Sequence, residues 1–71
     1  MAVGFVPDVG ENVLVWVADA WRLCRVQKTM IDATGLHVEV WPLRMRDKRT
    51  RWVAGNLVKP LPRDWDGEDA A

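Results

Sequence analysis

Residues 36 to 41 read Leu-His-Val-Glu-Val-Trp, and this stretch decides the fold class. Aliphatic side chains occupy its even positions, while His37, Glu39 and Trp41 occupy its odd positions. Strict alternation is typical of a strand with one face on a core, because successive side chains point to opposite faces. The even positions are therefore predicted to face the core. Trp41 then shares the outward face with His37 and Glu39, as a large apolar side chain without a core position.

Two further strands are predicted before this one. Residues 12 to 17 carry three valines in alternation, and such β-branched content favours a strand over a short helix. Residues 21 to 28 place Cys24 and Val26 on one face, with the alternating residues between them on the other. Residues 29 to 35 are expected to form the loop of a long hairpin, in which Gly35 takes a positive φ.

The remainder of the chain completes an all-β pattern. Pro42 ends regular pairing, residues 43 to 50 form a loop, and strands are expected at 51 to 53 and at 58 to 62. Five short strands with no amphipathic helix predict an antiparallel sheet that closes into a small barrel. The domain plan is a flank at 1 to 8, the barrel at 9 to 62 and an acidic tail at 63 to 71.

Composition limits the class of protein. A chain of 71 residues with 49% hydrophobic content builds one small folded domain. Its apolar runs are far shorter than the roughly 20 residues of a membrane span, so no membrane partner is expected. The single Cys24 can close no bridge within the chain and is predicted to be buried, which favours a reducing compartment, in the cytoplasm or the nucleus. Without serine, tyrosine or a metal-ligand motif, neither enzyme activity nor a cofactor is expected.

The zero net charge hides an uneven distribution of charge. Residues 63 to 71 carry a charge of −3, which leaves +3 for the preceding 62 residues. Within the stretch from 44 to 51, five cations face Asp47 alone. These cations are Arg44, Arg46, Lys48, Arg49 and Arg51. Three interpretations are open. The cations form a surface that binds DNA or RNA phosphates beside Trp41 or Trp52, they bind an acidic protein, or they form a solvated loop without a partner.

Four short motifs resemble the Tudor and Agenet group of Src-homology-3-like barrels, over about residues 9 to 62. Val-Gly-Glu-Asn-Val-Leu-Val-Trp at 9 to 16 looks like the group's opening strand, and Trp-Arg-Leu-Cys-Arg-Val at 21 to 26 is similar to its second. Val-Glu-Val-Trp at 38 to 41 resembles the third strand, and Asn-Leu-Val-Lys-Pro-Leu at 56 to 61 the closing element. The resemblance implies a five-stranded Tudor-like barrel that acts as a binding module.

In this group an aromatic cage at one end of the barrel binds methylated lysine or arginine of a peptide. The resemblance places Trp16 and Trp41 at cage positions, with Trp21 as a further aromatic nearby. Arg22 and Arg44 stand where the group carries other aromatic residues. The expected function is therefore a non-enzymatic reader of a peptide or a methylated side chain, in chromatin or a ribonucleoprotein. The alternatives are a nucleic-acid-binding barrel and a structural subunit that docks on a larger complex, and the oligomeric state is left open.

Overall fold

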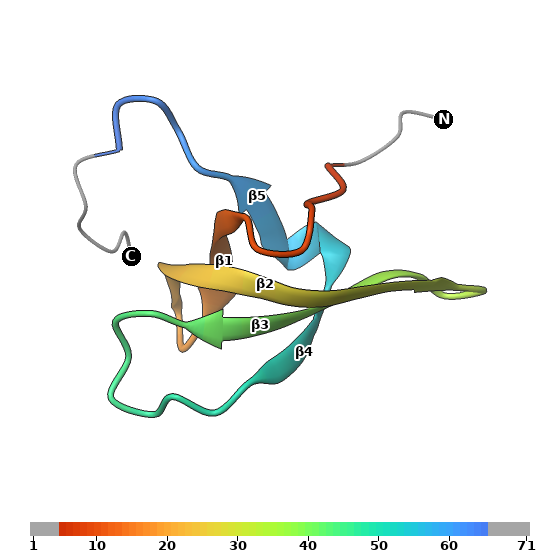
Figure 1. Cartoon of the computed structure of the whole chain (residues 1–71), viewed down its shortest axis with the longest axis horizontal. Coiled ribbons are helices and arrows are strands. Elements are labelled where there is room, and N and C mark those ends of the chain that lie inside the picture. The colour runs from red at the N-terminus through yellow and green to blue at the C-terminus, as the bar shows by residue number, and fades with distance from the viewer. Residues whose placement is uncertain (1–4, 66–71) are drawn as a thin grey trace.

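The computed structural model describes residues 5 to 65, which form one antiparallel sheet and no α-helix (Figure 1). The strands of this part are β1 (Asn12–Val17), β2 (Ala20–Asp32), β3 (Gly35–Pro42), β4 (Arg51–Ala54) and β5 (Val58–Pro60). A single 3-10 turn, Gly55–Leu57, separates β4 from β5. The predicted all-β class with five antiparallel strands is therefore confirmed. No described helix has the length and apolar character needed to cross a bilayer.

The main error in the predicted elements lies in β2. This strand continues through Asp32, so residues 29 to 32 are not part of a loop. They pair with β3, where Thr29 is opposite Val38 and Ile31 is opposite Leu36. The hairpin is thus closed by a tight turn just before Gly35, whose φ of 115° agrees with the predicted positive value. The β2–β3 hairpin extends well beyond the other strands (Figure 1).

The order of the strands in the sheet is β4-β3-β2-β1-β5. Within residues 5 to 65, no hydrogen-bonded ladder joins β4 to β5, the two edge strands. The prediction that the sheet closes into a barrel is therefore wrong. The physical reason is local, because β5 has only three residues and Pro60 and Pro62 lack a backbone donor. The two edges are instead connected covalently, since only Gly55–Leu57 lies between β4 and β5. A β-bulge between Val26 and Lys28 bends the long β2 further.

One face of the bent sheet carries the core. Its buried members are small or β-branched and come from β1, β2, β3 and β5: Val13, Val15, Cys24, Val26, Val38, Val40 and Val58. Phe5, Leu36 and Val53 pack against them, so the N-terminal flank contributes to the core from Phe5 onward. Burial of Cys24 and the inward position of Val38 and Val40 confirm the predictions from alternation. Residues 1 to 4 of the predicted flank and 66 to 71 of the predicted acidic tail lie outside the described residues.

Candidate functional site

Four tryptophans lie on the outer face of the sheet, opposite the valine core. Trp16 and Trp21 are register partners on β1 and β2, Trp41 pairs with Arg25, and Trp52 pairs with Glu39. Trp16, Trp41 and Trp52 expose 37%, 45% and 48% of their surface. The outward position predicted for Trp41 is confirmed, and Trp21 and Trp52 share it. Both side chains follow the alternation of their own strands away from the core.

Trp16 and Trp21 form a compact aromatic pair. Their ring centroids are 5.6 Å apart, and the planes meet at 67° in an edge-to-face arrangement. The ammonium of Lys59, which reaches across from β5, lies 4.2 Å from the centroid of the Trp21 ring. The face of Trp21 thus already holds a cation of the same chain.

The two arginines assigned to cage positions have other roles. Arg22 donates from Nε to the Val17 carbonyl (3.1 Å) and from an Nη to the Ala18 carbonyl (3.4 Å), so it secures the β1–β2 turn. Arg44 places its guanidinium 5.2 Å from the centroid of the Trp65 ring. Trp65 is half-buried, and its Nε1 is shielded from solvent. The structure therefore brings Trp16 and Trp21 together but engages Arg22 and Arg44 elsewhere.

Trp41 and Trp52 are the exposed indoles that flank the basic loop, residues 44 to 51. Trp41 is the penultimate residue of β3, before this loop, and Trp52 follows it on β4. Their cross-strand neighbours on the outer face include Arg25, opposite Trp41, and Lys28, opposite Glu39. Two aromatic platforms thus share one face with cations of the strands and with a loop of net charge +4.

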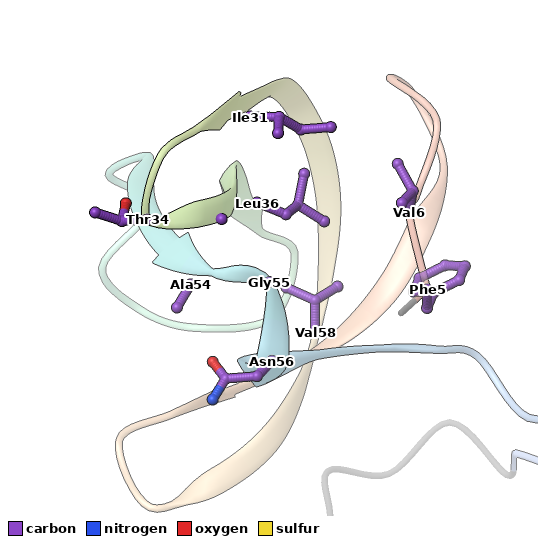
Figure 2. A pocket seen from close by; sticks show the side chains of 10 residues that line it. Phe5, Val6, Ile31, Thr34, Leu36, Ala54, Gly55, Asn56 and Val58 are labelled. Atoms are coloured by element: carbon purple, nitrogen blue, oxygen red, sulfur yellow. The ribbon is translucent and has the colours of Figure 1, made fainter. Parts of the chain in front are cut away.

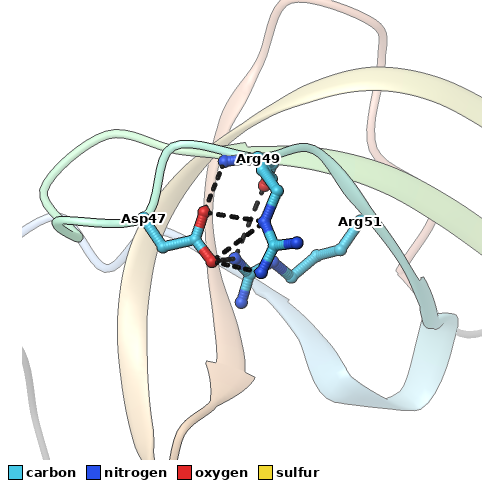
Figure 3. Close-up of polar contacts among 3 residues, drawn as sticks. All are labelled: Asp47, Arg49 and Arg51. Atoms are coloured by element: carbon cyan, nitrogen blue, oxygen red, sulfur yellow. Dashed lines mark hydrogen bonds and ion pairs between the residues drawn. The ribbon is translucent and has the colours of Figure 1, made fainter.

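Asp47 organises the C-terminal half of the basic loop (Figure 3). Its carboxylate accepts the backbone N–H of Arg49 at 3.0 Å and the Arg49 side chain at 2.9 to 3.2 Å, while Arg51 lies at 3.7 Å. These bonds, the Arg49 side chain first, lower the pKa of Asp47 from 3.8 to about 2, and they raise the pKa of Arg49. Asp47 therefore stays ionised and fixes two guanidinium groups beside each other.

The other cations of the loop differ in how far they are engaged. Lys48 donates to the Leu43 carbonyl at 2.5 Å, and Arg44 stacks on Trp65. Arg46 is exposed and makes no polar contact with any of residues 5 to 65. Four of the five predicted cations thus lie in one exposed connection between β3 and β4, the fifth, Arg51, begins β4, and Arg46 is the one most open to a partner.

The sequence did not predict an open apolar groove that the structure has at the end of the β2–β3 hairpin (Figure 2). This hollow of about 870 Å³ lies between the N-terminal segment, the end of the β2–β3 hairpin and the 3-10 turn. Phe5, Val6, Ile31 and Leu36 are the large apolar side chains among its lining residues, and Ile31 is 71% exposed. The available signal was the apolar character of Ile31 in a segment expected to be a loop. None of the outer-face tryptophans lines this hollow or the smaller one beside Asp47.

No group of three metal-ligating side chains is found within the described range of 5 to 65. His37 instead contacts Asp32 (3.1 Å) and Thr34 (2.8 Å) at the hairpin turn.

Compared with protein-family models, curated proteins and solved structures, the chain has no match. The assignment of a function therefore depends on the geometry of the outer face and the basic loop.

Proposed function

We propose that this protein binds single-stranded DNA or RNA with the outer face around Trp41 and Trp52 and with the basic loop. The observation that carries the proposal is the exposure of these two indoles on either side of a loop with a net charge of +4. Exposed indoles gain nothing for folding, but they offer flat surfaces on which bases can stack. Cations beside such platforms attract the phosphates that connect the bases.

The proposal specifies single strands because the bases of a duplex are already stacked on one another. An indole that stands on a sheet surface reaches a base only when the base is free to leave its neighbours. Arg25 lies beside Trp41 on the same face, and Arg46 projects from the loop without a partner among the described residues. The strand is thus expected to run across the outer face, with bases on the indoles and phosphates on these cations.

The test is fluorescence anisotropy with a labelled 12-nucleotide oligothymidine and its RNA counterpart over a range of salt concentrations. Trp41→Ala and Trp52→Ala are each expected to weaken binding by ~1–3 kcal/mol, the usual contribution of one stacked base. Arg46→Ala is expected to reduce the slope of log K against log salt by about 0.7, as for the loss of one phosphate contact on a single strand.

Ala33→Asp is the matched control for Arg46→Ala, because it also makes the net charge more negative by one. Ala33 lies in the exposed β2–β3 turn, at the end of the molecule opposite the basic loop (Figure 1). The Ala33→Asp substitution should leave the slope of log K against log salt unchanged. Absence of binding at low salt, or binding that is indifferent to both tryptophan substitutions, would contradict the proposal.

The second candidate is the Tudor-like reader of a methylated lysine or arginine. Its specific support is the Trp16–Trp21 pair, which holds the Lys59 ammonium against an indole face. A connection between the two edges of the sheet through Gly55–Leu57 is compatible with the barrel-like curvature that this group would need. In the same assay format, binding of a trimethyl-lysine peptide with weak salt dependence and loss on Trp16→Ala would favour this candidate.

A further inference from the structure

We propose that two copies of this chain associate through the edge of β2 at residues 28 to 32, which pair with each other as antiparallel strands centred on Met30. This edge belongs to the part of the β2–β3 hairpin that extends beyond the other strands (Figure 1). It has β3 on one side only, since the ladder between β1 and β2 ends at Arg25. An open strand edge exposes alternate pairs of N–H and C=O groups and is a template for another chain. The pairing needs no nucleic acid, so it is independent of the proposed function.

The open edge has two defined ends. At one end, Val26 accepts the Gly10 N–H (2.8 Å) and donates to the Glu11 carbonyl (2.9 Å), and a β-bulge follows. No backbone bond from the described N-terminal residues reaches further along β2. At the other end, the hairpin turn returns the chain into β3. Residues 28 to 32 lie between these limits, so two copies that both use the whole edge place Met30 opposite the partner's Met30.

The charges of this edge are complementary to those of a second copy. Its sequence, Lys-Thr-Met-Ile-Asp, begins with a cation and ends with an anion. When two such strands run in opposite directions about Met30, Lys28 lies opposite the partner's Asp32 at both ends of the contact. Side chains that are directly opposed in antiparallel strands have Cβ atoms ~4.5–5.5 Å apart, which brings ammonium and carboxylate together. A shift of the register by one residue would lose both ion pairs.

Both members of this ion pair are available for the contact. Lys28 is exposed and makes no polar contact with any of residues 5 to 65. Asp32 holds the hairpin turn through Oδ1 alone, which accepts both bonds from Thr34 and contacts His37. Its Oδ2 has no partner among the described residues, and the Thr34 bonds lower the pKa of Asp32 to about 2, so the carboxylate stays charged. The turn and the ion pair with a second copy are therefore compatible.

The same register brings exposed apolar side chains together. Met30 and Ile31 expose 48% and 71% of their surface. Met30 would meet the partner's Met30 on the outer face of the sheet. Ile31 is the register partner of Leu36 and shares its core-side face, where the Ile31 side chains of the two copies become diagonal neighbours. Because the contact is limited to one short strand from each copy, the dimer is expected to be weak and to form at high protein concentration.

The first test is sedimentation velocity of the full-length chain, from micromolar to millimolar concentration and without nucleic acid. The wild type is expected to pass from monomer to dimer. Lys28→Glu replaces both ion pairs by pairs of like charge, so it is expected to weaken the dimer by about tenfold. Arg63→Glu is the matched control, because it makes the same change of charge at an exposed residue in the segment after β5, away from the hairpin (Figure 1). A chain that stays monomeric at millimolar concentration, or a dimer that both variants weaken equally, would overturn the proposal.

Disulfide trapping tests the register without changing the ion pairs. Met30→Cys places two thiols opposite each other, with Cα atoms ~4.5–5.5 Å apart, which is a separation that a disulfide spans. Ala33→Cys, in the exposed hairpin turn, would lie ~20 Å from its counterpart, six strand positions away. Under mild oxidation, Met30→Cys is therefore expected to form the covalent dimer at least about tenfold faster than Ala33→Cys. Cys24 is buried and does not compete. Equal rates for the two variants would overturn the pairing about Met30.

Discussion

Ala18 and Asp19, the two residues that connect β1 to β2, both have left-handed backbones, with φ of 53° and 62°. The left-handed conformation costs an L-residue such as alanine ~1–2 kcal/mol, whereas Asn and Asp adopt this conformation more readily. Arg22 donates to the carbonyls of Val17 and Ala18 and thereby holds the chain in this conformation. The turn geometry is thus imposed on Ala18 by its neighbours.

Ala18→Asn is therefore expected to raise the free energy of unfolding by about 0.5–1 kcal/mol, because asparagine is compatible with the left-handed turn. Urea denaturation followed by tryptophan fluorescence measures the change. Ala54→Asn is the control, since Ala54 is exposed and has an extended backbone with φ −68° and ψ 146°. An equal gain at both positions would show that the turn conformation is not the reason.

Asp32 gives a prediction for pH at the same scale. Thr34 donates to its carboxylate from Oγ1 (2.6 Å) and from the backbone N–H (2.8 Å), and these bonds lower the pKa of Asp32 from 3.8 to about 2. Because the folded pKa lies below the ordinary value, the linked stability is present above pH 3.8 and is lost as the pH falls through about 2.

Thr34→Val removes the hydroxyl donor but keeps the backbone donor and the branched shape. We expect the pKa of Asp32 to rise toward 3.8 without reaching it, as measured by carboxyl 13C shifts in an NMR titration. Ala33→Val, in the same turn, should leave the titration unchanged. A Thr34→Val protein in which Asp32 still titrates near 2 would mean that the hydroxyl bond is not the main cause.

At the scale of elements, the alternation of apolar and polar residues was sufficient to predict a strand wherever one face of that strand is buried. It located β1 to the residue and assigned the two faces of β3, because valines on one side and polar or aromatic groups on the other leave one register. The prediction of a loop is wrong for residues 29 to 32, which belong to β2. Thr34 donates two hydrogen bonds to the Asp32 carboxylate, and these bonds close a tight turn directly after Asp32, so the strand continues up to this residue.

The candidate site was predictable in its parts and not in its arrangement. The sequence located the basic loop and the outward Trp41, because charge and alternation are local properties. The partners of Arg22 and Arg44 depend on contacts made by the folded chain, with a turn carbonyl and with Trp65. The outward position of Trp52 depends on its register with Glu39 across β3 and β4, which composition alone does not fix.

At the scale of the whole molecule, the curvature of the sheet depends on the passage from β4 to β5. These strands are at opposite ends of the sheet order, yet only Gly55–Leu57 separates them along the chain. The sheet must therefore curl until its two edges lie within reach of one short turn. Leu36 from β3 packs under this turn, against the core, and closes the molecule on that side.

Gly55 is required at this crossing by its small size. A Cβ added there would lie 2.9 Å from both Cβ and Cδ2 of Leu36, closer than packed carbon atoms approach. Gly55→Ala is therefore expected to destabilise the fold by about 1–3 kcal/mol, as other overpacked sites do. Gly10→Ala is not a suitable comparison because its φ is 92°, so Ala54→Ser, at the exposed end of β4, serves as the mild neighbouring control.

A double-mutant cycle with Leu36→Ala isolates the clash from any other effect of Gly55. Leu36→Ala removes Cδ2 and Cγ, two of the three atoms that the new methyl group would meet, and leaves Leu36 Cβ in place. Gly55→Ala should therefore cost less in the Leu36→Ala background than in the wild type, with the free energies of unfolding taken from urea titrations. Equal costs in both backgrounds would exclude the steric explanation. The connection would then hold the two edges together through its backbone conformation and not through its fit over Leu36.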